Sequence, residues 1–242
     1  MSCEYSILVP ARVDSTRLPR KLLLAKSGKT LLEHSLENLQ SLRHQSELWL
    51  VTDSEELADK GRPWVDDIHF STKVFNSGTE RIAEVLPKLN SNWILNVQAD
   101  EPEIEVSALR KLMTRMISGQ PSMGTLGALF PNREMWQNPN AVKLLLDARG
   151  CALTFSRQAI PYGGDYNTPR VLHHLGVYAY HISLLSQWHD LPVGIFETVE
   201  RLEQLRALEN GIPIAVEVVD CAHKGIDTDA DYEDFVKRVL RN

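Results

Sequence analysis

Four cationic side chains are gathered in one short stretch near the start of the chain, at Arg12, Arg17, Arg20 and Lys21. They follow the apolar run Ile7–Val9, which predicts a buried strand that ends at Pro10, because proline cannot donate a hydrogen bond to a sheet. In open parallel sheets, ligands bind beyond the carboxyl ends of the strands. The loop therefore predicts a site for a polyanion, with a nucleoside triphosphate as the candidate.

The positive charge of this stretch is local. The whole chain carries 26 basic and 32 acidic residues and a net charge of −6, which argues against non-specific binding of nucleic acid. Residues 12–29 hold six basic residues and one acid, Asp14. On charge alone, a solvated basic stretch explains this segment as well as an anion site does.

Two aspartates are candidate metal ligands. Asp100 lies in Asn96–Pro102, directly after the apolar run Trp93–Val97, and Asp227 lies in Lys224–Thr228 before a helical pattern. Mg²⁺ commonly takes one or two protein carboxylates and leaves its other positions to phosphate and water. Each aspartate alone fits a cap of the following turn or helix, whereas the two together favour a two-carboxylate Mg²⁺ site.

Common nucleotide and nucleophile signatures are missing from the chain. It has no Gly-x-Gly-x-x-Gly after a strand, no Gly-x-x-x-x-Gly-Lys-Ser/Thr and no Gly-x-Ser-x-Gly. A dinucleotide-binding Rossmann site, a P-loop and a nucleophile elbow are therefore disfavoured. The polyanion has to be held by side chains and backbone of the first loop.

Other polar segments admit both a structural and a functional role. Ser77–Arg81 fits a helix start, and Arg157 could hold a carboxylate as a bidentate partner. His173 and His174 are expected on opposite faces of a strand, so at most one of them faces a given pocket. The charged run Glu200–Arg206 fits a solvated helix face with pairs four residues apart.

Apolar spacing predicts the elements that must position these residues. Strands are expected at Tyr5–Val9, Leu48–Thr52, Ile68–Ser71, Trp93–Val97, Gly124–Phe130, Val142–Leu146, Leu172–Tyr180 and Ile212–Val219. Helices are expected at Thr30–Leu42, from Ser54, and at Thr79–Leu89, Val106–Ile117, Thr198–Glu209 and Thr228–Leu240. The alternation predicts a mostly parallel α/β sheet flanked by helices, as a single domain over residues 1–242 with a β-rich insertion over roughly 120–195.

Composition and cysteine usage narrow the class of protein. The chain has 242 residues, 43% of them hydrophobic and 24% charged, which is typical of a globular protein. Cys3, Cys151 and Cys221 are far apart and form no Cys-x-x-Cys, so a reducing compartment is expected. With no signal-peptide pattern at the start and no apolar span near ~20 residues, we expect a cytoplasmic protein without a membrane partner.

Together, the ordered motifs resemble those of one family, the 3-deoxy-manno-octulosonate (KDO) cytidylyltransferases, also called CMP-KDO synthetases. The resemblance covers nearly the whole chain. It is carried by Pro10-Ala11-Arg12, Ser15–Pro19 with Lys21, Ser77–Arg81, Asn96–Gln98, Asp100–Pro102, Asn138–Lys143, Phe155–Arg157 with Ile160-Pro161, His174–Tyr178, Leu202–Arg206 and Asp227-Thr228.

The resemblance implies a nucleotidyltransferase-type, Rossmann-like fold with a smaller β-rich dimerisation region, and a homodimer. It implies that CTP and KDO give CMP-KDO and pyrophosphate, for lipopolysaccharide synthesis, with Mg²⁺ as cofactor. Arg12, Arg17 and Lys21 would hold the triphosphate, with Ser77 near the cytidine and Gln98 beside both substrates. Asp100 and Asp227 would bind Mg²⁺, so that Lys21, Asp100 and Asp227 form the catalytic set. The sugar pocket would be lined by Gln98, Arg157, His174, Tyr178, Glu200 and Gln204.

Four positions depart from the family pattern. Arg20 and Ala99 stand where the family usually has glycine, Asp14 where it has a small residue, and Glu103 where it has an apolar one. Alanine at position 99 would cost about 1 kcal/mol or more if that backbone needs a positive φ. These departures leave open a modified KDO, such as 8-amino-KDO, as the substrate, and also a non-catalytic nucleotide-binding relative. A sialic-type acid is a further alternative, because the enzymes that activate such acids share the Arg-rich first turn.

Overall fold

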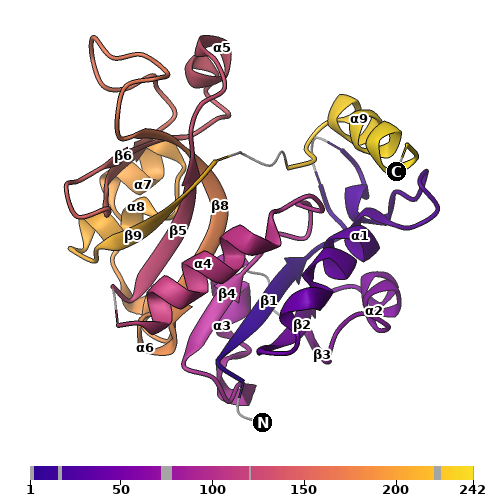
Figure 1. Cartoon of the computed structure of the whole chain (residues 1–242). Coiled ribbons are helices and arrows are strands. Elements are labelled where there is room, and N and C mark those ends of the chain that lie inside the picture. The colour runs from indigo at the N-terminus through magenta and orange to yellow at the C-terminus, as the bar shows by residue number, and fades with distance from the viewer. Residues whose placement is uncertain (1–2, 16–17, 72–77, 120, 221–224, 242) are drawn as a thin grey trace. The chain divides into compact units, whose positions relative to one another are not determined.

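The chain folds into two compact units. A computed structural model describes residues 3–15, 18–71, 78–119, 121–220 and 225–241. The first unit combines Met1–Val106 with His223–Asn242, and the second is Ser107–Ala222. In Figure 1 the first unit runs from indigo to magenta and regains the yellow C-terminal helix, whereas the second lies between magenta and orange.

The first unit is built on a parallel sheet with the strand order β3-β2-β1-β4. Its strands are β1 (Tyr5–Ala11), β2 (Ser46–Thr52), β3 (Asp67–Phe70) and β4 (Trp93–Asn96). Apart from Pro10, the apolar side chains of β1 and β2 are buried, as expected for a sheet covered on both faces. The predicted parallel α/β arrangement is confirmed, and the loops beyond β1 and β4 leave the sheet at its carboxyl edge.

β1 continues past the proline that was expected to end it. Pro10 and Ala11 pair with β2, whereas β4 pairs only with Ser6–Leu8. On its β4 side, β1 is therefore unpaired at Pro10, and a proline is accepted where no ladder bond needs its missing N–H. Arg12 follows directly after the strand.

Short helices complete the first unit. They are η1 (Lys21–Leu23), α1 (Leu31–Asn38), η2 (Leu39–Leu42), α2 (Glu55–Gly61), α3 (Gly78–Ala83), η3 (Leu86–Lys88) and α9 (Asp229–Val239). Thr30 and Glu33 form a capping box at the start of α1, and Ser54 caps α2, so both helices begin where the sequence predicts. The helix expected over Thr79–Leu89 is interrupted after Ala83, and Pro87, which lacks an N–H, lies in the separate turn η3.

The second unit is a mixed sheet with its own helices. Its strands are β5 (Met123–Ala128), β6 (Lys143–Leu146), β7 (Ala152–Ser156), β8 (Val171–His181) and β9 (Ile214–Val219). β5 lies parallel to β9 and antiparallel to β8, and β6 pairs with both β7 and β8. Its helices are α4 (Val106–Ile117), α5 (Arg133–Gln137), α6 (Ile182–Leu185), η4 (Trp188–Asp190), α7 (Ile195–Glu200) and α8 (Leu205–Glu209).

The single helix predicted over Thr198–Glu209 is wrong, because α7 ends where Arg201 turns into the left-handed region with φ 54°. The chain then folds back, so that Arg206 donates to both carboxylate oxygens of Glu197 at 2.8 and 2.6 Å. In one straight helix these residues would be separated by about 13 Å along the axis. Arg206 is the last residue of the charged run Glu200–Arg206, and it is buried together with Glu197. A solvated face, as expected for this run, is therefore wrong at Arg206, whereas Arg201 is exposed.

No helix among the described residues is both long enough and apolar enough to cross a bilayer.

Candidate active site

A cavity opens at the carboxyl edge of the first unit's sheet. It measures about 390 Å³ and receives residues from the loop after β1, the loop after β4 and the segment before α9. The residues that line it are Pro10, Arg12, Asp14, Ser15, Lys21, Leu22, Gln98, Ala99, Asp100 and Asp227. The strand-edge location predicted from the sequence is thus occupied by the basic loop and both candidate metal carboxylates.

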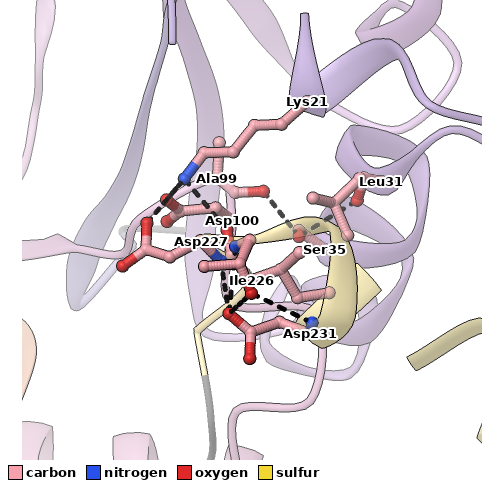
Figure 2. A network of polar contacts seen from close by, with 9 residues as sticks. Lys21, Leu31, Ser35, Ala99, Asp100, Ile226, Asp227 and Asp231 are labelled. Carbon is pink, nitrogen blue, oxygen red and sulfur yellow. Dashed lines mark hydrogen bonds and ion pairs between the residues drawn. The ribbon is translucent and has the colours of Figure 1, made fainter. Parts of the chain in front are cut away.

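Lys21 lies between the two aspartates, as Figure 2 shows. Its ammonium donates to Asp100 Oδ2, to Asp227 Oδ1 at 3.1 Å and to the carbonyl of Ile226 at 3.0 Å. The Lys21 side chain is only 12% exposed. The two carboxylates therefore face a common point, which the Lys21 ammonium occupies.

The approach to α9 positions Asp227. Thr228 is the N-cap of this helix, with Asp231 as its capping-box partner. The Asp231 carboxylate also accepts from the backbone N–H groups of Asp227 and Thr228, at 3.2 and 3.0 Å. The cap is thus Thr228, which answers the alternative that Asp227 itself caps the helix and leaves its carboxylate turned toward Lys21.

The loop after β4 positions Asp100. Val97 N donates to the Leu8 carbonyl at 3.1 Å, and Ile226 N donates to the Asp100 carbonyl at 3.0 Å, which joins this loop to the segment that carries Asp227. Ala99 is buried, and its carbonyl accepts from Ser35 Oγ at 2.7 Å. The backbone of Ala99 has no positive φ, so alanine is unstrained at this position.

The strained departure is Arg20. It adopts φ 54° immediately before η1, a conformation that favours glycine. Its guanidinium donates to both carboxylate oxygens of Glu56 at 2.6 Å and does not line the cavity. The Arg20 charge is therefore paired with Glu56 outside the cavity.

Of the other residues expected to bind the nucleotide, the structure describes Arg12 and Gln98. Arg12 is exposed in the cavity and forms no hydrogen bond or ion pair with another described residue, and Gln98 and Asp14 line the same space. Arg17 and Ser77 lie outside the described residues. Arg81, the last residue of the Ser77–Arg81 motif, is buried and pairs with Asp53 at 2.9 Å.

In the second unit, Arg157 and Glu200 brace one another. Glu200 accepts from Ser156 Oγ at 2.6 Å and from Arg157 N at 2.8 Å. The Arg157 guanidinium donates to three backbone carbonyls, at distances of 2.8, 3.2 and 3.4 Å. Since a guanidinium has five N–H groups, the arginine is held in place while donors remain for a ligand.

His174 and Tyr178 lie on β8, and their rings contact one another. His174 packs against Phe155 on the face opposite to His173, which stacks on Phe130. The Thr125 hydroxyl donates to the Val177 carbonyl at 2.7 Å, so it accepts from His174 Nε2 at 3.1 Å. Burial, reinforced by His173, lowers the pKa of His174 to about 3, and the ring is neutral.

Gln204 is 4% exposed, and its amide nitrogen has no hydrogen-bond partner among the described residues. A buried donor without a partner is costly, and a ligand hydroxyl or carboxylate would satisfy it. The structure therefore brings Lys21, Asp100 and Asp227 together in the first unit. In the second unit, Arg157 and Glu200 form one group, and His174 with Tyr178 forms another.

Sequence reasoning assigned no role to Lys143. It is fully buried on β6, and its ammonium donates to the carbonyls of Asn138 and Arg157 at 2.8 and 2.7 Å. Burial lowers its pKa. A charged residue inside the apolar run Ala141–Leu146 was the available signal, because lysine is rarely fully buried without partners.

Comparisons with known proteins point to one family. A model of the cytidylyltransferase family matches residues 6–217. A 3-deoxy-manno-octulosonate cytidylyltransferase of Actinobacillus pleuropneumoniae is 36% identical over 99% of both chains, and one from Rhodopirellula baltica is 36% identical over 96% of this chain and 97% of its own.

Solved structures point to the same family. A CMP:2-keto-3-deoxy-manno-octonic acid synthetase complexed with CTP superposes with a TM-score of 0.91 and 31% identity, over 98% of this chain and 99% of the other. A putative glucose-1-phosphate thymidylyltransferase from Bacillus anthracis shares the fold at a TM-score of 0.70 and 10% identity, over 97% of this chain and 95% of its own.

Proposed function

The chain belongs to the cytidylyltransferase family, and we propose that it activates KDO by joining this acid sugar to CTP. The anomeric hydroxyl of the sugar attacks the α-phosphorus of CTP, the bond to the β-phosphate oxygen breaks, and CMP-KDO and pyrophosphate result. The observation that carries the proposal is the full-length likeness to a synthetase complexed with CTP. The product is an activated sugar of the kind used in lipopolysaccharide synthesis.

The residue types in the cavity suit this displacement. No protein nucleophile is required, because the sugar hydroxyl attacks directly. Charge develops on phosphate oxygens, so positioning and cationic stabilisation supply most of the catalysis. Arg12, exposed in the cavity, and Lys21 are the described cations that would hold the triphosphate, and Gln98 lies beside them.

Mg²⁺ fits the donor set of this cavity. Asp100 and Asp227 present hard oxygen donors to a point that already accommodates a cation, the Lys21 ammonium. Two carboxylates suffice, since phosphate and water complete the coordination of Mg²⁺ at such sites. Asp100 and Asp227 would hold the ion, which when bound neutralises phosphate charge and acidifies the attacking hydroxyl.

The second unit carries groups suited to an acid sugar. Arg157 retains guanidinium donors for a carboxylate, and the Gln204 amide offers an unused buried donor. Because His174 is neutral, it takes part through packing and hydrogen bonding and not as a cation. Glu200 keeps Arg157 in place through the Arg157 backbone N–H and guanidinium. Tyr178, whose ring contacts His174, would line the sugar pocket with them.

We further propose a homodimer that works in the cytoplasm. Four apolar side chains over residues 193–199 are exposed, from 62% at Phe196 to 75% at Ile195, and the others are Val193 and Val199. A patch of this kind favours a protein partner. The two described cysteines, Cys3 and Cys151, are free thiols, in keeping with a reducing compartment.

Pyrophosphate release from CTP, measured with a panel of acid sugars, tests the function. We expect turnover with KDO. Turnover only with 8-amino-KDO or a sialic-type acid would assign the related substrate, and CTP binding without any turnover would indicate a non-catalytic relative.

The variant Asp100→Asn tests the proposed metal site in the same assay. We expect it to reduce turnover by at least about a thousandfold, because it removes a charged metal ligand at the reacting phosphate. Asp229→Asn, the matched control, removes the same charge from an exposed position two residues beyond Asp227 and should keep wild-type rates. Circular dichroism confirms folding, and wild-type rates for Asp100→Asn would remove this residue from the site.

A further inference from the structure

Lys21 has a full set of hydrogen-bond partners inside the protein. Its ammonium has three N–H groups, and they meet three acceptors: Asp100 Oδ2, the Ile226 carbonyl and Asp227 Oδ1. No donor is left for a phosphate oxygen. A nucleotide can therefore engage Lys21 only if one of these three acceptors is released.

The same ammonium neutralises the carboxylate pair. Asp100 and Asp227 come from segments far apart in the sequence and point at one atom, Lys21 Nζ (Figure 2). Without a cation between them the two carboxylates would repel each other, and the repulsion is strong where water is partly excluded. A lysine at this point stabilises the site in the absence of metal and nucleotide.

We propose that Lys21 is an internal counter-ion that competes with the divalent cation for Asp100 and Asp227. The proposal rests on the proposed function, because it assumes that these carboxylates are the metal ligands. An ammonium and a divalent cation cannot share the same two carboxylates without mutual repulsion. Divalent metal is therefore bound weakly by the nucleotide-free protein, and phosphate oxygens, as replacement acceptors for Lys21, release the carboxylates to the metal.

Lys21 is positioned to change its partner from a carboxylate to a phosphate through a small side-chain movement. The residue begins η1 in the loop after β1, and its side chain lines the same cavity as Arg12, which is exposed there. A triphosphate held by Arg12 thus lies in the space that the Lys21 side chain reaches. Lys21 then changes partner from carboxylate to phosphate by rotating its own side-chain bonds, without a movement of the backbone.

Binding of Mn²⁺ to the nucleotide-free protein, followed by electron paramagnetic resonance, tests the competition. We expect Lys21→Met to bind Mn²⁺ on the order of tenfold more tightly than the wild type, because the metal no longer has to displace an ammonium with charged partners. The control Lys26→Met removes the same charge from an exposed lysine that pairs with Glu233. It should bind Mn²⁺ as the wild type does.

Two further measurements keep the outcome interpretable. If Lys21→Met is destabilised, Mn²⁺ should raise its melting temperature more than it raises that of the wild type. In the double variant Lys21→Met with Asp227→Asn, the gain in Mn²⁺ affinity should disappear. Equal Mn²⁺ affinities of Lys21→Met and Lys26→Met would overturn the proposal, as would a gain that survives the loss of Asp227.

The pyrophosphate assay on the wild type separates this proposal from the proposed function. Turnover with CTP and KDO combined with no gain in Mn²⁺ affinity overturns the counter-ion role alone. A gain in Mn²⁺ affinity combined with no turnover on any acid sugar supports the counter-ion role and overturns the proposed reaction.

Discussion

At the scale of single residues, His174 shows how a sequence motif and its physical role can differ. It belongs to the segment His174–Tyr178, which resembles that of sugar-activating enzymes. The ring is buried between Phe155 and Tyr178, and its Nε2 is bonded to Thr125. Protonation would place an unpaired charge inside the second unit, which is why the pKa of His174 falls to about 3.

This lowered pKa predicts a loss of stability in acid. An unfolded histidine binds a proton below pH ~6.5, whereas folded His174 does so only near pH 3. Between these values the unfolded state binds more protons, so the free energy of unfolding falls as the pH falls. The contribution reaches about 1.4 kcal/mol per pH unit. It is absent above pH ~6.5 and saturates below pH 3.

Urea unfolding between pH 7.5 and 4.5 measures this effect. His174→Gln, which cannot titrate, should show a shallower decline of the unfolding free energy with falling pH than the wild type. The control is His189→Gln, which removes a histidine whose side chain is 90% exposed and should leave the slope unchanged. Identical slopes for wild type and His174→Gln would contradict the prediction.

Much of the first unit's site could be predicted from residue order. Asp100 and Arg12 follow buried strands, and the carboxyl ends of parallel strands share one edge of a sheet. The hydrogen bonds of Lys21 could not be predicted in this way, because its partner Asp227 lies 206 residues away in the sequence and no local pattern specifies their contact. Arg17 and Ser77 remain predictions from the resemblance, and so do the roles of the second unit's polar residues.

At the scale of elements, the turn before η1 carries a strained residue. Arg20 has φ 54° and pairs with Glu56 across the surface. The left-handed conformation destabilises a residue with a Cβ by about 1–2 kcal/mol, whereas an exposed ion pair stabilises the fold by at most about 1 kcal/mol. The backbone preference therefore exceeds the contribution of the ion pair.

Comparing two variants at this position isolates the backbone contribution. Both Arg20→Gly and Arg20→Ala lose the Glu56 pair, and we expect the glycine variant to be more stable by about 1 kcal/mol in urea unfolding. The same comparison at Lys111, an exposed position in α4, should give the opposite order, since alanine is favoured over glycine by about 1 kcal/mol inside a helix. A higher unfolding free energy for Arg20→Ala than for Arg20→Gly would contradict the left-handed backbone at this position.

Elements were predictable where local signals and tertiary contacts agree. The helix starts expected at Thr30 and Thr228 are the N-caps of α1 and α9, and α4 has the predicted bounds. The break between α7 and α8 was missed because it depends on the buried Glu197–Arg206 pair, which forms only after the chain reverses. β7 was missed as well, because its short alternation of buried Phe155 and exposed Leu153 is a weak signal.

At the scale of the whole molecule, the exposed apolar patch over residues 193–199 predicts self-association. Phe196→Glu should convert a dimer into a monomer in size-exclusion chromatography with light scattering. We expect a weakening on the order of thirtyfold or more, as for a central aromatic contact. Leu240→Glu, which changes an exposed leucine of the first unit, should leave the dimer intact. A monomeric wild type, or a dimeric Phe196→Glu, would contradict the prediction.

The organisation of the chain into one domain or two stays a prediction, but the way the first unit is assembled has a consequence for synthesis. Its two parts are interrupted by the whole of Ser107–Ala222. Lys21 and Asp100 leave the ribosome long before Asp227. The nascent chain therefore contains the ammonium and one carboxylate before the second carboxylate has been synthesised. A chain that ends before α9 would lack Asp227, and its first unit could not form the carboxylate pair that Lys21 joins.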